Sequence, residues 1–194
     1  MPTTTILRNL QDSIQLKQQL LADPATVALV AEMAARITAC YRAGGKVFFC
    51  GNGGSAADAQ HLSTELSGRY YYDRPPLFAE ALHVNSSYIT AVANDYAYED
   101  IYARWLTAIG QKGDVLVALS TSGNSPNVVK AIAQANANEM VTLGMTGASG
   151  GKMLGVCNLL LRVPSTDTPR IQECHMLCGH AICEIVEANL FPRP

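Results

Sequence analysis

The chain has 194 residues, of which 48% are hydrophobic, so it has room for a single domain with a sizeable core. Its formal net charge is −2 and no basic run occurs, which argues against nucleic acid as a partner. No apolar stretch approaches the roughly 20 residues that a helix needs to span a bilayer, which argues against a membrane protein.

Residues 1–5 lack the charged-then-apolar order of a signal peptide, so we expect a cytoplasmic protein. The six cysteines form no CxxC pair, and in that compartment they are expected to be buried thiols rather than disulfides. We expect one domain over residues 1–194. It would consist of a helical part at 1–45 and an α/β core at 46–194.

The first part of the chain is predicted to form two helices. Residues 5–21 carry apolar side chains at helical spacing, and Pro24 is well placed to open a second helix that runs to about Ala43. The second helix has apolar residues on more than one side. This pattern favours contact with other helices over a lone position at the surface.

From residue 46 onward, short apolar runs alternate with helical stretches. The predicted strands are 46–50, 78–82, 114–119, 140–145 and 158–163. The predicted helices are 55–69, 98–109, 126–138 and 169–190. Short continuous strands that alternate with helices indicate an α/β protein whose parallel sheet is covered on both faces.

Two loops rich in Gly, Ser and Thr follow the first and third predicted strands, at Gly51–Ser55 and Ser120–Ser125. Open parallel sheets bind ligands at the carboxyl ends of their strands. Glycines let the backbone approach an anion, and the helix N-termini that follow offer free N–H groups. We therefore expect a phosphorylated ligand, with the four hydroxyls of the second loop as the better phosphate cradle. For either loop alone, a tight turn with a helix cap remains an alternative.

Two further pairs of polar residues fall on predicted helices. His61 and Glu65 are four residues apart and share a helix face. Gln172 and His180 are eight residues apart, which places them on one broad face of the last helix. Such a set could bind zinc, although glutamine is an uncommon ligand. From spacing alone, an ordinary surface pair and a core histidine are simpler interpretations.

These loops and helices resemble the SIS (sugar isomerase) domain family, and more closely its phosphoheptose isomerase members. The matching segments are 51–61 (GNGGSAADAQH), 90–96 (TAVANDY), 113–132 (GDVLVALSTSGNSPNVVKAI), 146–153 (TGASGGKM) and 170–180 (RIQECHMLCGH). The resemblance implies a SIS-type sandwich, with a five-stranded parallel sheet flanked by helices and N-terminal helices that pack in a homotetramer. It also implies an aldose–ketose isomerase that converts sedoheptulose 7-phosphate to D-glycero-D-manno-heptose 7-phosphate in bacterial heptose and lipopolysaccharide core synthesis.

The resemblance also implies roles for particular residues. Glu65 would be the base and His180 the acid in moving a proton between C1 and C2 of the sugar. One zinc ion per subunit would be bound by His61, Glu65, Gln172 and His180, so Glu65 would have two roles that are in tension. The implied substrate contacts are Asn52, Gly53, Gly54, Ser55, Glu65, Asn94, Asp95, Ser120, Thr121, Ser122, Ser125 and Gln172. Arg69 matches a position that can approach the phosphate, but an exposed arginine at a helix end is an equal alternative.

Two alternatives within the same family stay open at this point. One is a non-catalytic SIS protein that binds the bacterial replication initiator, which residues 190–192 and the region 179–187 (GHAICEIVE) partly resemble. We expect that branch to lack the full catalytic set, whereas Glu65 and His180 are both present. The other is a SIS sensor of sugar phosphates that regulates transcription. Residues 1–45 are too apolar and too weakly basic for its helix-turn-helix domain.

Overall fold

The computed structural model describes residues 2–193, and its five parallel strands form one sheet in the order β2-β1-β3-β4-β5. The strands are β1 Val47–Cys50, β2 Ala79–Ala81, β3 Val115–Leu119, β4 Val141–Thr146 and β5 Leu159–Arg162. Every residue of β1 and β3 is buried. Burial on both faces explains why these strands are continuous apolar runs. The predicted α/β class with a five-stranded parallel sheet is confirmed.

Helices cover both faces of the sheet. They are α1 Pro2–Leu21, α2 Pro24–Arg42, α3 Gly54–Ser67, α4 Ser86–Asp95, α5 Ile101–Ile109, α6 Pro126–Ala137 and α7 Thr168–Leu190, with single 3₁₀ turns η1 Tyr98–Asp100 and η2 Gly151–Met153. One face packs against α2, α3 and α7, and the other packs against α4, α5 and α6. Alternate strand residues divide between the two layers: Val47 and Phe49 face the first, and Phe48 and Cys50 face the second.

Helix α4 is the one long helix among the described residues that the sequence pattern did not predict. It begins after Asn85, whose side chain accepts a hydrogen bond from the backbone N–H of Tyr88 at 3.1 Å. Only Val92 is buried along the helix. The core contacts of the helix come from Tyr88, Ile89, Val92 and Ala93, a run of six residues that is too short for helical periodicity to stand out in the sequence.

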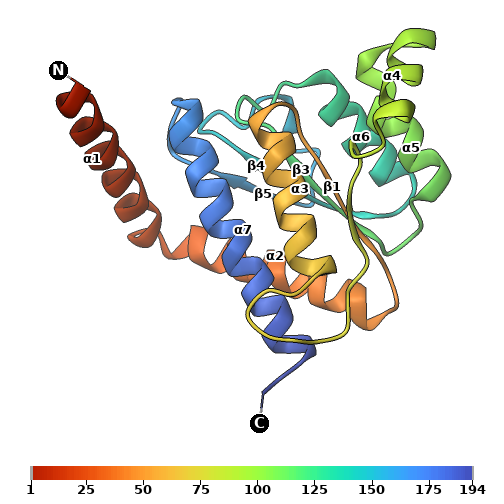
Figure 1. Cartoon of the computed structure of the whole chain (residues 1–194), viewed down its shortest axis with the longest axis horizontal. Coiled ribbons are helices and arrows are strands. Elements are labelled where there is room, and N and C mark those ends of the chain that lie inside the picture. The colour runs from red at the N-terminus through yellow and green to blue at the C-terminus, as the bar shows by residue number, and fades with distance from the viewer. Residues whose placement is uncertain (1, 194) are drawn as a thin grey trace.

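Helices α3 and α7 lie side by side and run in the same direction (Figure 1). Near the start of both helices, the side-chain amide of Gln172 lies against Gly54. Two turns further on, Gly179 faces Leu62, where an added Cβ would lie 2.6 Å from both methyl carbons of the leucine. A glycine at this position therefore lets the two helices approach closely. Side chains on the facing sides of α3 and α7 can therefore contact one another.

Helix α1 is packed at one end and exposed at the other. Leu16 and Leu20 form a small buried cluster with Val163, Ile171 and Cys174. Towards the N-terminus the helix extends away from the body of the molecule, and its apolar side chains there are exposed (Figure 1). Those side chains are Ile6, Leu7, Leu10 and Ile14. Among residues 2–193, no helix combines the length and apolarity that crossing a membrane requires.

The six cysteines are all free thiols, and five of them belong to the three clusters of buried residues. Cys50 lies in the layer formed with α4, α5 and α6. Cys40, Cys178 and Cys183 lie in the layer formed with α2, α3 and α7. Cys174 lies in the cluster beneath α1. The expectation of buried thiols is confirmed for five of the six, since Cys157 is only half-buried.

Candidate active site

The two polar loops lie side by side at the carboxyl ends of β1 and β3, because these strands are parallel neighbours with Cys50 opposite Ala118. A reciprocal pair of side-chain amide hydrogen bonds joins them. Asn52 Nδ2 donates to Asn127 Oδ1, and Asn127 Nδ2 donates to Asn52 Oδ1, each at 2.8 Å. The hydroxyl of Tyr98 also donates to Asn52 Oδ1 at 3.2 Å. The first loop is therefore tied to the start of α6 and to η1.

The first loop turns sharply into α3. Gly53 precedes the helix with φ of 56°, a conformation that favours glycine. The carbonyl oxygen of Gly51 accepts a hydrogen bond from the Tyr102 hydroxyl at 2.5 Å. Because the side chain of Asn52 is engaged by its neighbours, the loop presents mainly backbone N–H groups, and no side chain caps the helix. Such a helix N-terminus suits an anion.

In the second loop, the hydroxyls of Ser120 and Ser125 lie 3.0 Å apart, and Ser125 does not cap α6 with its side chain. The segment 146–153 packs against this loop. Gly123 has φ of 68°, and an added Cβ would lie 2.1 Å from the carbonyl oxygen of Gly150. The backbone N–H of Lys152 donates to Asn124 Oδ1 at 3.1 Å. Close packing thus fixes the loop while its hydroxyls stay near the helix N-terminus.

Three side chains from α3 and α7 meet in one cluster. His61 Nε2 lies 3.1 Å from Glu65 Oε1, and His180 Nε2 lies 3.0 Å from His61 Nε2. One ligand atom from each residue falls within 4.8 Å of the other two. Ligands bound tetrahedrally to zinc at 2.0–2.1 Å lie about 3.3 Å from one another. The two separations of 3.1 Å and 3.0 Å are close to this value, and nitrogen and oxygen donors suit a divalent metal ion such as zinc.

The other expected site residues are placed less centrally. Gln172 is half-buried near the start of α7, with its amide against Gly54 beside the first loop. Asn94 and Asp95 are exposed at the end of α4, where Asn94 Nδ2 donates to Asp95 Oδ1 at 2.8 Å. Across residues 2–193, neither of these two bonds to the loops or to the His61–Glu65–His180 cluster. Arg69 is exposed just beyond α3.

The structure adds residues that the sequence analysis did not place near the site. Asn127 and Tyr98 hold Asn52, as described above, and the ring of Tyr70 lies 5.9 Å from that of His180. Asp58 lies one turn before His61, and burial raises the pKa of its carboxyl, against a smaller lowering by His61. These residues lack a distinctive pattern in the sequence because their contacts are tertiary.

Residues 14–147 match the family model of the SIS domain, a class of α/β domain. The chain is 58% identical over 161 residues to phosphoheptose isomerase of Rhodospirillum rubrum, covering 83% of this chain and 86% of that protein. It is 47% identical to phosphoheptose isomerase 2 of Campylobacter jejuni, covering 94% and 90%. The solved structure of phosphoheptose isomerase from Neisseria gonorrhoeae superposes with a TM-score of 0.91 at 37% identity, covering 97% of this chain and 100% of that one.

The chain therefore belongs to the phosphoheptose isomerases of the SIS domain family, which are enzymes. The family expected from the loop motifs is confirmed. Nothing in these comparisons favours a non-catalytic SIS protein.

Proposed function

We propose that the protein isomerises sedoheptulose 7-phosphate to D-glycero-D-manno-heptose 7-phosphate, in the bacterial synthesis of heptose for the lipopolysaccharide core. The observation that carries this proposal is the cluster in which Glu65 and His180 both lie next to His61. The two helices that supply these residues, α3 and α7, begin beyond the carboxyl ends of β1 and β5. Aldose–ketose isomerisation needs one group to remove a carbon-bound proton and another to protonate the carbonyl oxygen. A carboxylate and an imidazole can perform these two steps.

In the proposed reaction, the second loop binds the phosphate through the hydroxyls of Ser120, Thr121, Ser122 and Ser125. The backbone of residues 52–55 and the side chains of Asn94, Asp95 and Gln172 complete the sugar site. Glu65 removes the proton from C1 while His180 protonates the C2 carbonyl oxygen, which gives an enediol. Glu65 then returns its proton to C2 while His180 takes the proton from the C1 hydroxyl, which forms the aldehyde and restores both residues.

One zinc ion per subunit would be held by His61, Glu65, Gln172 and His180, and when bound it would polarise the carbonyl or orient its ligands. Glu65 Oε1 faces His61. The second carboxylate oxygen is therefore the one we assign to proton transfer. This division removes the tension between the two roles of Glu65.

We also infer a homotetramer in the cytoplasm. The exposed apolar residues of α1 recur at Ile6, Leu10 and Ile14, four residues apart, and so form a stripe on one helix face. A stripe of this kind supports packing against other subunits. The six free thiols support a reducing compartment.

The proposal is tested by an isomerase assay on sedoheptulose 7-phosphate, beside fructose 6-phosphate and arabinose 5-phosphate. We expect turnover of the heptose phosphate alone, and we expect Glu65→Gln to keep the fold but lose activity by about 100-fold or more. Glu184→Gln makes the same change at an exposed site on α7 and is expected to behave like the wild type. Preference for another sugar would contradict the substrate, and near-normal turnover by Glu65→Gln would contradict the catalytic assignment.

A further inference from the structure

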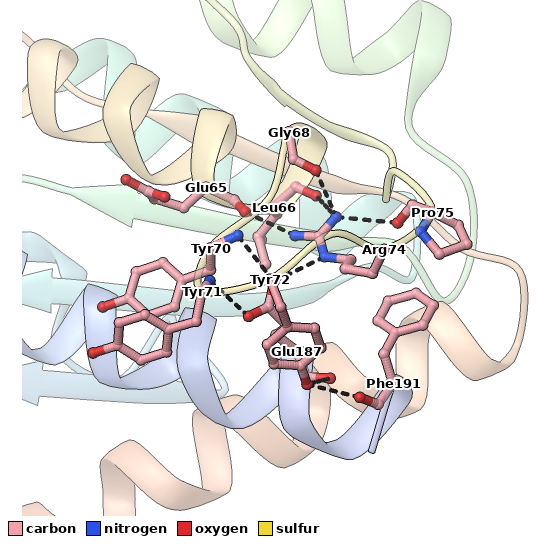
Figure 2. Close-up of polar contacts among 10 residues, drawn as sticks. All are labelled: Glu65, Leu66, Gly68, Tyr70, Tyr71, Tyr72, Arg74, Pro75, Glu187 and Phe191. Carbon is pink, nitrogen blue, oxygen red and sulfur yellow. Dashed lines mark hydrogen bonds and ion pairs between the residues drawn. The ribbon is translucent and has the colours of Figure 1, made fainter. Parts of the chain in front are cut away.

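A buried ion pair joins the segment after α3 to the end of α7 (Figure 2). Arg74 Nε lies 3.1 Å from Glu187 Oε1, and the two side chains are only 2% and 1% exposed. Both residues lie outside the site described above. Removing two charges from water costs several kcal/mol per ion, and apolar residues of similar volume often serve stability as well. The contacts of this pair show what the charges do here.

Arg74 caps the carboxyl end of α3. Its Nη2 donates to the backbone carbonyl oxygen of Glu65 at 2.8 Å, and its Nη1 donates to those of Leu66 and Gly68 at 2.7 Å and 2.9 Å (Figure 2). The last four carbonyls of a helix have no partner within the helix, and a cation is favourable at that end. The guanidinium therefore holds the backbone of Glu65 itself, as well as the turn that follows it.

Glu187, on α7, binds the backbone of the segment that follows α3. Its two carboxylate oxygens accept hydrogen bonds from the backbone N–H groups of Tyr70 and Tyr71, at 2.9 Å and 2.8 Å (Figure 2). The ring of Tyr70 packs beside the imidazole of His180, which lies two turns before Glu187 on α7. The carboxylate thus links Arg74, Tyr70 and the helix that carries His180.

We propose that the Arg74–Glu187 pair is a positioning device for the catalytic residues, which fixes the end of α3 that carries Glu65 against the part of α7 that carries His180. Neither residue touches the substrate. The pair acts through the backbone of Glu65 and through the ring of Tyr70. Hydrogen bonds from a planar guanidinium and a carboxylate are directional, so they define a separation and a register between the helices that apolar packing alone would leave looser. This inference rests on the proposed function for the roles of Glu65 and His180.

The test compares Glu187→Gln with a matched control, Asp114→Asn, in the full-length protein. Asp114 is also a buried carboxylate that accepts two backbone N–H bonds, from Lys46 and Gln111, and pairs with one cation, Lys46 Nζ, at 3.3 Å. It directly precedes β3, and so lies at the amino ends of the strands, whereas the loops lie at the carboxyl ends. Both changes replace a carboxylate by an amide, so a loss of stability alone should affect the two variants alike.

With both variants folded, we expect kcat of Glu187→Gln to fall about 10- to 100-fold below that of Asp114→Asn. KM should change less than about threefold, because the phosphate loops are not disturbed. The chain has four histidines, which allows a readout that needs no activity. In NMR spectra, the imidazole signals of His61 and His180 should move in Glu187→Gln but not in Asp114→Asn, and those of His83 and His175 should stay in place in both.

Arg74→Lys provides a second variant, which keeps the charge beside Glu187 but has one nitrogen in place of the three that bond to Glu187, Leu66 and Glu65. We expect a smaller loss of kcat in the same direction. Equal kcat in Glu187→Gln and Asp114→Asn, unmoved His61 and His180 signals, or failure of both Arg74→Lys and Glu187→Gln to fold would overturn the inference. If the wild type does not isomerise the heptose phosphate, the proposed function fails and the histidine signals alone decide this inference.

Discussion

Because Gly54 has no side chain, the amide of Gln172 can lie against its backbone. A Cβ added to Gly54 would lie 2.5 Å from Gln172 Nε2, so alanine would displace the amide. The backbone of Gly54 is helical, so alanine suits the position itself. We expect Gly54→Ala to retain stability and to weaken zinc binding about 10-fold, measured by competition with a chromophoric chelator. Unchanged zinc affinity would count against Gln172 as a ligand.

His175 predicts how stability depends on pH. It is fully buried on α7, and Nε2 donates to the carbonyl oxygen of Thr146 at 3.2 Å. Burial lowers the pKa of His175 to about 4, and the hydrogen bond to Thr146 opposes only part of this effect. The unfolded chain binds a proton near the ordinary pKa of 6.5 and the folded chain does not, so stability falls as pH drops from 6.5 to 4.

We expect this effect to cost the wild type about 3 kcal/mol of unfolding free energy between pH 7 and pH 4. His175→Gln keeps a donor for Thr146 but cannot take up the proton, so it should lose less over the same range. Urea unfolding at pH 7, 5.5 and 4 measures the difference. Equal losses in the two proteins would show that His175 is not the group responsible.

At the scale of the elements, the start of α6 holds the first loop in place. Asn127 is buried and shares both amide hydrogen bonds with Asn52. We expect Asn127→Ala to release Asn52 and to raise KM for the sugar phosphate about 10-fold, with a smaller change in kcat. Asn136→Ala, near the other end of the same helix, is the control, and its KM should stay near that of the wild type. The measurement is steady-state kinetics, and an equal KM for both variants would contradict the role of Asn127.

Much of this architecture could be predicted from the sequence because the central strands are buried on both faces. Val115–Leu119 is a continuous apolar run, and the structure has a strand there. The edge strand β2 is only three residues long, so its predicted bounds of 78–82 were too wide. Helix α4 was missed because it buries only Val92 fully and its other core contacts span little more than one turn. Sequence patterns register burial, and they are weakest where an element buries little.

Some contacts of the candidate site could likewise be predicted from the sequence, and others could not. The contact between His61 and Glu65 follows from helical spacing alone. The approach of His180 depends on the relative direction of α3 and α7, which no local pattern contains. Arg74, next to Pro75 in the segment between α3 and β2, looks like a surface residue in the sequence. Glu187 does carry a signal, because it interrupts the apolar face that Cys183 and Val186 continue, and a charge at such a position needs a partner.

For the molecule as a whole, the exposed stripe of α1 predicts association. Leu10 lies at the centre of that stripe, so Leu10→Glu would place a charge in the interface that we infer between subunits. We expect the wild type to sediment as a tetramer and Leu10→Glu as smaller species, measured by analytical ultracentrifugation. Gln11→Glu adds the same charge to a neighbouring exposed position and should leave the tetramer intact. Dissociation of both variants, or of neither, would rule out this stripe as the contact.

The buried thiols make it possible to follow how the molecule opens. Burial raises the pKa of Cys40 and of Cys178 to about 11, so these thiols should react with alkylating reagents only during local or global unfolding. Cys50, Cys183 and Cys174 lie in three separate clusters, one in each layer beside the sheet and one beneath α1. Labelling rates at these positions would therefore report which part of the core exchanges with solvent first.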